Sequence, residues 1–423
     1  MNRIPLANPF TPLTHAECVA RLAEIAQLPT MTQLPLQRNA LTRYGAMAAA
    51  SLLTLLAGMH SARGNAATPP ESAQMELVYV GTQKGQIDAL RLDTSTGKLT
   101  AIGAVAEGPK STWVAAHPHL PMLYAVDDDN THEGSVTAYA VDRETGSLTK
   151  VNAVATGGAG STYLGWDIPS MTLLDANYAS GSVSSIAVNR DGSLGSLVST
   201  IQETGSGPNR RQASAHAHSA VIDPSGQYAL VPDLGADRVF VYGFDRASHA
   251  VTAGNEVNPQ SFVTPPGSGP RRIAFGRNGQ FAYVLTELSA EIMVLHWDAS
   301  EGHLTLVQSV PTSTEEFQGV RSGAELALSR DGRFVYVENR GQNALVVYRI
   351  SPDSGELSLV QRTSAGGVKP WGFAIDPSGR WLLVANQQSG TVNAFSIDPE
   401  SGMVADSGEA ADIPTAVSVA FVK

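Results

Sequence analysis

The residues most able to do chemistry occupy a few short segments in the second half of the chain. PNRRQASAHAHSAV (208–221) contains His216 and His218, which lie on the same side of an extended strand because side chains alternate with a period of two. Such a pair is suited to metal binding or to proton transfer near neutral pH. Glu287 and Arg340 are poor turn residues placed within the largely apolar segments YVLTEL and VYVENRG. We therefore expect both to serve function rather than local structure.

Several common catalytic centres are missing from the sequence. No third ligand accompanies the histidine pair, and no HExxH or EF-hand pattern occurs, so we expect neither a metal nor another cofactor. No Gly-x-Ser-x-Gly elbow is evident, which argues against a serine acyl-enzyme. The single cysteine, Cys18, lies close to the N-terminus, so the rest of the chain has no disulfide and no cysteine nucleophile.

The elements that position these residues belong to a repeat. A turn such as Asp-Pro-Ser-Gly, an apolar run, one or two polar residues and a second apolar run recur along the chain. The apolar positions that precede the polar residues are Tyr79, Tyr124, Leu174, Leu230, Tyr283, Tyr336 and Leu383. They define seven units of about fifty residues, each with room for four strands, which is typical of a β-propeller. We predict an all-β, seven-bladed β-propeller.

The end of the chain fits this architecture. The first unit begins directly at ELVYV (76–80), with no strand before it, and the chain ends on an additional strand, TAVSVAFVK (415–423). We predict that this C-terminal strand completes and closes the first blade. Closure of the ring removes exposed sheet edges.

The order of the strands determines which residues share a rim of the propeller. If strands alternate in direction from the channel outward, the blade connections and the ends of the second strands meet at one rim. Seven polar pairs or near-polar pairs lie there: Thr82-Gln83, Asp127-Asp128, Asn177-Tyr178, Asp233-Leu234, Thr286-Glu287, Asn339-Arg340 and Asn386-Gln387. Alignment of the inner strands also places His218, Arg271 and Trp371 in equivalent positions. We expect a ring of polar side chains around one mouth of the channel.

These segments resemble the seven-bladed β-propeller lactonase family, whose best-known activity is 6-phosphogluconolactonase and which includes fungal carboxymuconate cycloisomerases. The resemblance covers residues 76 to 423 and is carried by RQASAHAH, VPDLGADRVFVY, GPRRIAF, YVLTEL, VYVENRG and DPSGRWLLVANQQSGTVNAFSID. It implies a hydrolase of carbohydrate metabolism that opens a sugar or related acid lactone. The catalytic residues implied are His218, Arg271, Glu287 and Arg340. The expected substrate-binding residues are Arg211, Gln212, His216, Asp233, Asn177 and Trp371.

Opening a lactone needs an activated water, a group that stabilises the oxyanion and a proton for the leaving alkoxide. Glu287 is the candidate general base if partial burial tunes its pKa, and His218 is suited to act as base or acid. Arg271 and Arg340 are suited to anchoring an anionic group or the oxyanion.

The sequence departs from the family pattern at three places. Asp127-Asp128 stands where the family usually has Asn-Glu, Trp371 follows Pro370 where arginine is usual, and Arg272 replaces a common histidine. These departures leave two alternatives open. One is a non-catalytic exported propeller that binds a ligand or protein at this rim, and the other is a lactonizing cycloisomerase that uses the same residues.

The N-terminal residues 1–66 differ from the rest of the chain and are predicted to be a leader with an export signal peptide. Tyr44 to Met59 carry no charge, Arg38 and Arg43 precede them, and Gly-Asn-Ala follows. Sixteen residues are short for a membrane span, so we expect cleavage near Ala66, with an uncleaved anchor as the alternative. The lactonase-like domain would then comprise residues 67–423.

Composition and net charge limit the kinds of binding partner to expect. The chain has 43% hydrophobic and only 16% charged residues, which argues against disorder and against a long helical array. Its formal net charge of −11 argues against general affinity for nucleic acid or an anionic membrane. We expect a periplasmic or secreted monomer with a small-molecule lactone as partner, no nucleic acid, and no stable membrane span after cleavage.

Overall fold

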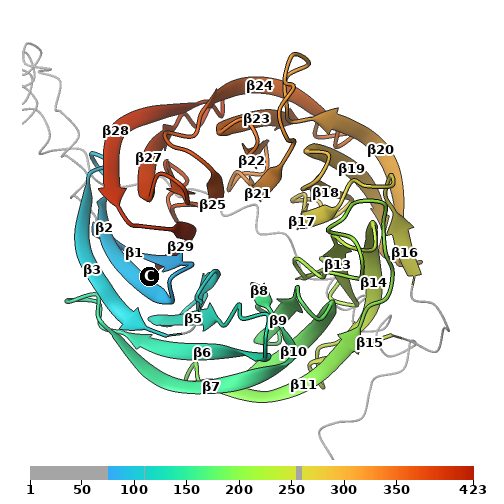
Figure 1. Ribbon diagram of the computed structural model, residues 1–423, viewed down its shortest axis with the longest axis horizontal. Coiled ribbons are helices and arrows are strands. Elements are labelled where there is room, and N and C mark those ends of the chain that lie inside the picture. Colours follow the sequence, from blue (N-terminus) through green and yellow to red (C-terminus); the bar gives the residue numbers. More distant parts are fainter. Residues whose placement is uncertain (1–74, 109, 254–259) are drawn as a thin grey trace, which may run out of the picture. The chain divides into compact units, whose positions relative to one another are not determined.

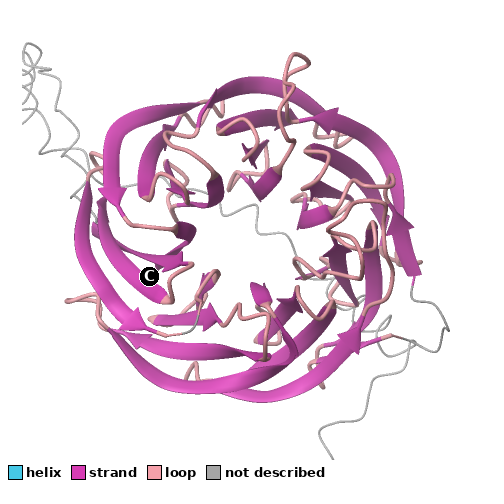
Figure 2. Ribbon diagram, in the orientation of Figure 1, coloured by secondary structure: helices cyan, strands magenta, loops and turns pink. Residues whose placement is uncertain are grey.

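The computed structural model describes residues 75–108, 110–253 and 260–423, and every regular element in these ranges is a β-strand. Seven sheets surround a central axis (Figure 1), and strands and loops make up the whole of the described part (Figure 2). The predicted all-β, seven-bladed propeller is therefore confirmed. The predicted leader and export signal lie outside the described residues.

The first four blades follow the chain from blue to green-yellow in Figure 1. From the axis outward, blade 1 contains β29 (Ala416–Val422), β1 (Met75–Thr82), β2 (Gln86–Asp93) and β3 (Leu99–Glu107). Blade 2 contains β4 (Val114–Ala116), β5 (Met122–Val126), β6 (Glu133–Val141) and β7 (Leu148–Ala159). Blade 3 contains β8 (Ser161–Asp167), β9 (Thr172–Asn177), β10 (Ser182–Val188) and β11 (Leu194–Gln202). Blade 4 contains β12 (Val221–Ile222), β13 (Tyr228–Asp233), β14 (Arg238–Asp245), and both β15 (Ala250–Thr252) and β16 (Gln260–Val263) paired with β14.

The remaining three blades complete the ring. Blade 5 contains β17 (Pro270–Phe275), β18 (Phe281–Thr286), β19 (Glu291–Asp298) and β20 (His303–Pro311). Blade 6 contains β21 (Gly323–Leu328), β22 (Phe334–Asn339), β23 (Ala344–Ile350) and β24 (Leu357–Ser364). Blade 7 contains β25 (Pro370–Ile375), β26 (Trp381–Asn386), β27 (Thr391–Ile397) and β28 (Val404–Asp412).

The C-terminal strand closes the ring as predicted. β29 pairs antiparallel with β1, and Leu77 faces Val422 at one end of the ladder. Residues more than three hundred positions apart in the sequence thus share one sheet. Blade 1 gains its innermost strand from the last residues of the chain, so the ring has no unpaired edge between its first and last blades.

Apolar clusters between neighbouring blades form the core. Each of seven clusters joins two adjacent sheets, and the one between blades 7 and 1 contains Leu383 from β26 and Val80 from β1. The second strands are buried on both faces because each blade packs against two neighbours, which explains why FAYVLT and FVYVEN are almost entirely apolar. Burial of these faces fixes the height at which each second strand ends.

The tyrosines of the repeat make hydrogen bonds between blades. Tyr79, Tyr124 and Tyr283 donate their hydroxyl protons to glycine carbonyls in the outer hairpins of the next blade, and the Tyr124 bond to Gly192 measures 2.6 Å. Gly192 has a φ of 85°, which favours glycine over residues with a Cβ. The fourth tyrosine, Tyr336, is buried and has no partner for its hydroxyl among the described residues.

This difference predicts unequal effects of removing the two hydroxyls. Tyr124→Phe should lower the free energy of unfolding by about 1 kcal/mol, because a buried hydrogen bond is lost and the Gly192 carbonyl is left unpaired. Tyr336→Phe is the matched control and should leave stability unchanged or raise it. Chemical denaturation of both variants measures the difference, and equal losses would contradict the assignment of the blade-to-blade bond.

Candidate active site

Bulges in the inner strands set the level of several site residues. In blades 3, 5 and 7 the pairing with the second strand shifts by one residue at Thr162, Arg271 and Trp371. In blade 4 the pairing also shifts by one residue. The shift lies between the Ala217–Asp233 bridge and the start of β12, and His218 lies in this interval. A bulge leaves one residue unpaired and redirects its side chain. The predicted equivalence of His218, Arg271 and Trp371 is therefore confirmed by the register.

A second ring follows the ends of the second strands. Its members are Gln83, Asp128, Tyr178, Leu234, Glu287, Arg340 and Gln387. The backbone N–H groups of Asp128, Tyr178 and Glu287 each donate to a carbonyl at the entry of the inner strand of the same blade, at 2.7 to 3.0 Å. These bonds hold the ring at one height around the mouth of the channel, on the rim that the sequence indicated.

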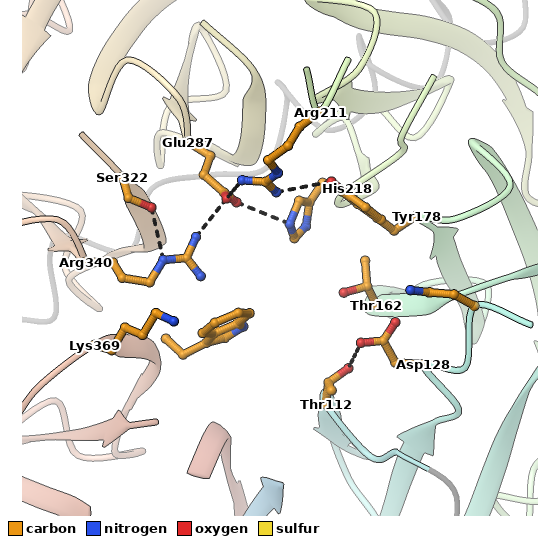
Figure 3. Close-up of a pocket in the computed structure, with 12 residues that line it drawn as sticks. Thr112, Asp128, Thr162, Tyr178, Arg211, His218, Glu287, Ser322, Arg340 and Lys369 are labelled. Atoms are coloured by element: carbon orange, nitrogen blue, oxygen red, sulfur yellow. Dashed lines mark hydrogen bonds and ion pairs between the residues drawn. The ribbon is translucent and has the colours of Figure 1, made fainter. Parts of the chain in front are cut away.

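A pocket of about 370 Å³ opens within these two rings (Figure 3). Six of the seven blades and their connections contribute to its wall. The lining residues are Thr112, Asp128, Asn130, Thr162, Tyr178, Arg211, His218, Glu287, Ser322, Arg340, Lys369 and Trp371. Almost every lining side chain can donate or accept a hydrogen bond, so the pocket suits a small, polar ligand.

Glu287 is the centre of the charged wall. Its Oε1 lies 2.5 Å from Arg211 Nη1 and 2.8 Å from Arg340 Nη2, and its Oε2 accepts a hydrogen bond of 3.1 Å from Arg271 Nε. The three arginines come from a loop before blade 4, from blade 5 and from blade 6. Glu287 is only 3% exposed, so the carboxylate replaces its lost hydration with these charged donors.

The arginines decide the protonation state of Glu287. Burial by itself would raise the pKa of this carboxyl, but Arg340, the His218 ring and Arg271 together hold the pKa well below its usual value. An ionised carboxylate that is stabilised so strongly is a poor proton acceptor near neutral pH. This result argues against the expected role of Glu287 as general base and favours a role in holding the arginines.

His218 is neutral and has a defined tautomer. Burial and then Arg271 lower the pKa of its imidazole to about 3. Arg272 Nη1 lies 3.2 Å from Nδ1, and because a guanidinium can only donate, Nδ1 must accept. The ring proton is therefore on Nε2, which lies 3.6 Å from Glu287 Oε2. His218 presents an N–H donor to the pocket rather than a base.

Arg340 and Arg211 are the arginines that reach the pocket surface. Arg340 Nε donates to Ser322 Oγ at 3.0 Å, and its guanidinium lies 4.2 Å from the centre of the Trp371 ring. Arg211 Nη2 donates to the Tyr178 hydroxyl at 3.1 Å. Each guanidinium is thus held from two or more sides while one edge borders the pocket (Figure 3).

Comparison with known proteins agrees with the fold. A model of the family described as lactonase, seven-bladed β-propeller, matches residues 77–421. The chain belongs to this lactonase family. It is 34% identical over 348 residues to the 6-phosphogluconolactonase of Bacillus subtilis strain 168, with 81% of this chain and 97% of the relative covered.

Solved structures similar to this lactonase-family chain include proteins described as lactonases. The periplasmic gluconolactonase of Pseudomonas aeruginosa is similar, with a TM-score of 0.76 and 34% identity over 83% of this chain and 99% of that chain. A putative 6-phosphogluconolactonase of Bacteroides fragilis has a TM-score of 0.75 and 27% identity, and 84% of this chain and 100% of that chain are covered.

Arg271 belongs to the site but lies beneath the pocket. It is 1% exposed and does not line the pocket, and besides Glu287 it donates to the Ala324 carbonyl. Burial and the neighbouring Arg272 lower its pKa to about 9, which leaves it cationic at neutral pH. Arg271 therefore does not lie at the pocket surface, where it was expected to anchor an anionic group, and is joined to the pocket wall through Glu287.

Four expected substrate-binding residues do not line the pocket. The Asn177 amide bonds to Thr156 of blade 2 and to Ser184 of blade 3. The Gln212 amide donates to the Leu234 carbonyl and to Asp237, and Asp233 accepts the N–H groups of His216 and Ala236. The His216 ring stacks on Tyr178 with 4.5 Å between ring centres, and its Nδ1 lies 2.8 Å from the Tyr178 carbonyl. These side chains shape the loops that carry Arg211 and Tyr178.

Several lining residues carry no clear chemical signal in the sequence. Asp128 and Tyr178 belong to the ring after the second strands, and Lys369 precedes Pro370. Thr112, Asn130, Thr162 and Ser322 are short polar residues in or beside blade connections, where such residues are common for local reasons. Lys369 lies two residues before the bulge at Trp371 and Thr162 lies at a bulge, so the positions of the inner-strand bulges are the signal that indicates them.

Buried charges fill the channel below the pocket. The Arg272 guanidinium lies 4.6 Å from the ring centres of both Trp113 and Tyr163 and bonds to Glu325 through Nε. Glu338 is 0% exposed, and neither carboxyl oxygen has a hydrogen-bond partner among the described residues. Burial and then Glu325 raise the pKa of Glu338 well above its usual value. Within the described ranges, no cluster of three or more histidine, cysteine or acidic residues could hold a metal.

The raised pKa of Glu338 predicts a pH-dependent cost in stability. Folded protein keeps the Glu338 proton, whereas unfolded protein releases it above the usual glutamate pKa of about 4.3. Stability of the wild type should therefore fall relative to Glu338→Gln as pH rises above that value, by up to about 1.4 kcal/mol per pH unit. Thermal unfolding at pH 5, 6.5 and 8 measures the gap. Glu301→Gln, at an exposed turn, is the control, and a gap for Glu338→Gln that does not widen with pH would contradict a neutral Glu338.

Proposed function

We propose that the protein hydrolyses the ring ester of a sugar acid in this pocket. One observation carries the proposal: Arg211, Arg340 and the N–H of His218 converge on Glu287 at one wall of a polar pocket. The family relationship supports it, since similar proteins carry the names 6-phosphogluconolactonase and gluconolactonase. The natural substrate is then an aldonolactone, with or without a phosphate.

The wall supplies what the transition state of ester opening requires. Attack by water turns the carbonyl oxygen into an oxyanion, which fixed cationic or N–H donors stabilise. Arg211 and Arg340 offer guanidinium edges, and His218 offers Nε2–H, on the same side of the pocket (Figure 3). Glu287 lines the pocket and holds these donors in place, whereas Arg271 acts as a positioning residue because it does not line the pocket and bonds to Glu287. The donors need no reorganisation when charge develops.

Lys369 gives the pocket a further anion-binding group. It lines the pocket and forms no ion pair among the described residues, whereas Arg211 and Arg340 are already paired with Glu287. A phosphate or carboxylate on the substrate would find its counter-ion here. We propose that the active form is a monomer, and light scattering in solution measures that state.

Turnover of lactones by the purified protein tests the proposal. We expect hydrolysis of gluconolactone or its 6-phosphate above the spontaneous rate. Arg340→Ala should lower kcat/KM by about 10² to 10³, the range found when one oxyanion donor is removed. The assay follows acid release at constant pH with both substrates.

Arg330→Ala is the matched control, because Arg330 lies in the turn between β21 and β22 at the other rim. It should keep kcat/KM within about twofold. Equal rates for wild type, Arg340→Ala and Arg330→Ala would remove the proposed site. Absence of turnover with either lactone would favour a binding propeller, and ring closure of a carboxymuconate instead would favour a cycloisomerase.

We further propose that the protein acts outside the cytoplasm. The apolar run from Tyr44 to Met59 and the preceding arginines support an export signal, and a periplasmic gluconolactonase is among the similar structures. In the described ranges, no helix is long and apolar enough to cross a membrane.

Expression of the full chain in a Gram-negative host tests export. Mass spectrometry of the periplasmic fraction should find a protein that begins near residue 67. A full-length protein retained with the membranes would instead indicate an uncleaved anchor, and a full-length protein in the cytoplasm would contradict export.

A further inference from the structure

Asp128 is the counterpart of Glu287 on the opposite side of the ring. Glu287 directly follows β18 and Asp128 is the second residue after β5, and each donates its N–H to a carbonyl at the entry of the inner strand of its blade. Blades 2 and 5 are three positions apart in a ring of seven, so the two carboxyl groups face each other across the mouth. Figure 3 shows Asp128 on the wall opposite Glu287.

The two carboxyl groups have different neighbours at matching positions. Arg271 lies two residues after the carbonyl that receives the Glu287 N–H, and Thr112 lies two residues after the carbonyl that receives the Asp128 N–H. Glu287 therefore meets a guanidinium from its own blade, whereas Asp128 meets only a hydroxyl. Thr112 Oγ1 donates to Asp128 Oδ2 at 2.9 Å, and Oδ1 accepts no hydrogen bond from the residues that the structure describes.

The charges around Asp128 leave it suited to accept a proton near neutral pH. Burial raises its pKa, the Thr112 hydroxyl and Lys110 lower it, and Asp127 and Asp129 raise it again, to about 6 in total. Asp175, in the neighbouring β9, is affected by Asp128 as well. Burial, and to a smaller extent the negative charge of Asp128, raise the pKa of Asp175 to about 7. No cation forms an ion pair with Asp128 in the described part of the chain.

The other lining groups are poor candidates for a base. Glu287 is held ionised by arginines, and His218 has its Nδ1 occupied by Arg272. Burial raises the pKa of Tyr178, so its hydroxyl stays protonated. Threonine, serine, asparagine and tryptophan do not take up a proton at neutral pH. Among the residues that line the pocket, Asp128 is the remaining group that can.

We propose that Asp128 is the catalytic base, which activates the hydrolytic water from the wall opposite the arginine and histidine donors. The inference rests on the proposed lactonase function and deepens it by separating the two carboxylates by role. Two acidic groups whose surroundings push their proton affinities apart commonly divide acid-base and electrostatic work in this way.

The reaction balances with Asp128 as the carrier of one proton. Asp128 Oδ1 takes a proton from water as the water oxygen bonds to the lactone carbonyl carbon, and the carbonyl electrons move to the oxyanion beside Arg211 and Arg340. Collapse of this intermediate breaks the ring C–O bond. The protonated Asp128 then gives its proton to the leaving alkoxide, which restores the carboxylate and yields the open hydroxy acid.

Asp128→Asn tests the assignment, because asparagine keeps the size of the side chain and an oxygen for Thr112. In the full-length protein we expect kcat to fall by about 10² to 10⁴ with a smaller change in KM. The wild-type kcat/KM should rise with pH through about 6 as Asp128 ionises, and the residual activity of Asp128→Asn should lack that step. Circular dichroism and thermal unfolding check that the variant folds.

Two further variants make the test specific. Thr112→Val removes the hydroxyl that stabilises the carboxylate, so the step in the pH profile should move to higher pH. Asp129→Asn removes the charge of a half-buried neighbour whose carboxylate contacts Thr131 and His132 and does not line the pocket, and it should keep kcat within about twofold.

The possible results distinguish a failure of the proposed lactonase function from a failure of the role proposed for Asp128. Wild-type protein that opens no lactone would refute the proposed function and, with it, the role of Asp128. Active wild type with an equally active Asp128→Asn variant, or with an unchanged step in the profile of that variant, would refute the catalytic base alone. Loss of the step only in Asp128→Asn, with a raised step in Thr112→Val, would establish it.

Discussion

The site depends on one buried carboxylate that must be neutralised by arginines from different parts of the ring. Removing Glu287 from water is costly unless charged donors surround it, and Arg211, Arg271 and Arg340 provide these donors. Blades 5 and 6 and the loop before blade 4 must therefore be in place before the pocket has its charged wall. The charged wall therefore forms only when these three parts of the ring are assembled.

The repeat supplies positions, and the individual residues supply chemistry. Every blade offers one residue at its inner-strand bulge and one after its second strand, at heights fixed by packing between blades. Where those two residues are arginine and glutamate they form an ion pair, and where they are threonine and aspartate they leave a carboxyl with one neutral donor. A near-symmetric scaffold can in this way surround a ligand with unlike walls.

Periodicity made the fold and the rim predictable. Seven anchors at regular spacing were enough for the blade count, the closing strand and the equivalence of His218, Arg271 and Trp371. Partners of polar side chains were not predictable, because they depend on contacts between residues far apart in sequence. Asn177 and Asp233 were expected to bind substrate at this height, yet Asn177 bonds to Thr156 and Ser184, and Asp233 accepts backbone N–H groups of its own loop.

The surroundings of Glu287 argue against the expected role as a base for a related reason. A glutamate within apolar sequence indicates burial, and burial alone would raise its pKa toward neutrality. Three guanidinium groups reverse that effect, and their convergence appears only in three dimensions. The chemical role of a carboxyl group thus follows from its neighbours rather than from its type, which is why Asp128 escaped notice in a turn full of acidic residues.

Protonation of the buried Glu338 leaves the charged wall around Glu287 with an excess of positive charge. Four arginines, Arg211, Arg271, Arg272 and Arg340, form ion pairs with two carboxyl groups, Glu287 and Glu325, while burial keeps Glu338 protonated. If Glu338 were ionised, its negative charge would act on Arg271, Arg340 and Arg272 and cancel part of their positive charge. An unpaired buried acid costs stability, but here its neutrality leaves the arginines free to stabilise negative charge that develops on the substrate.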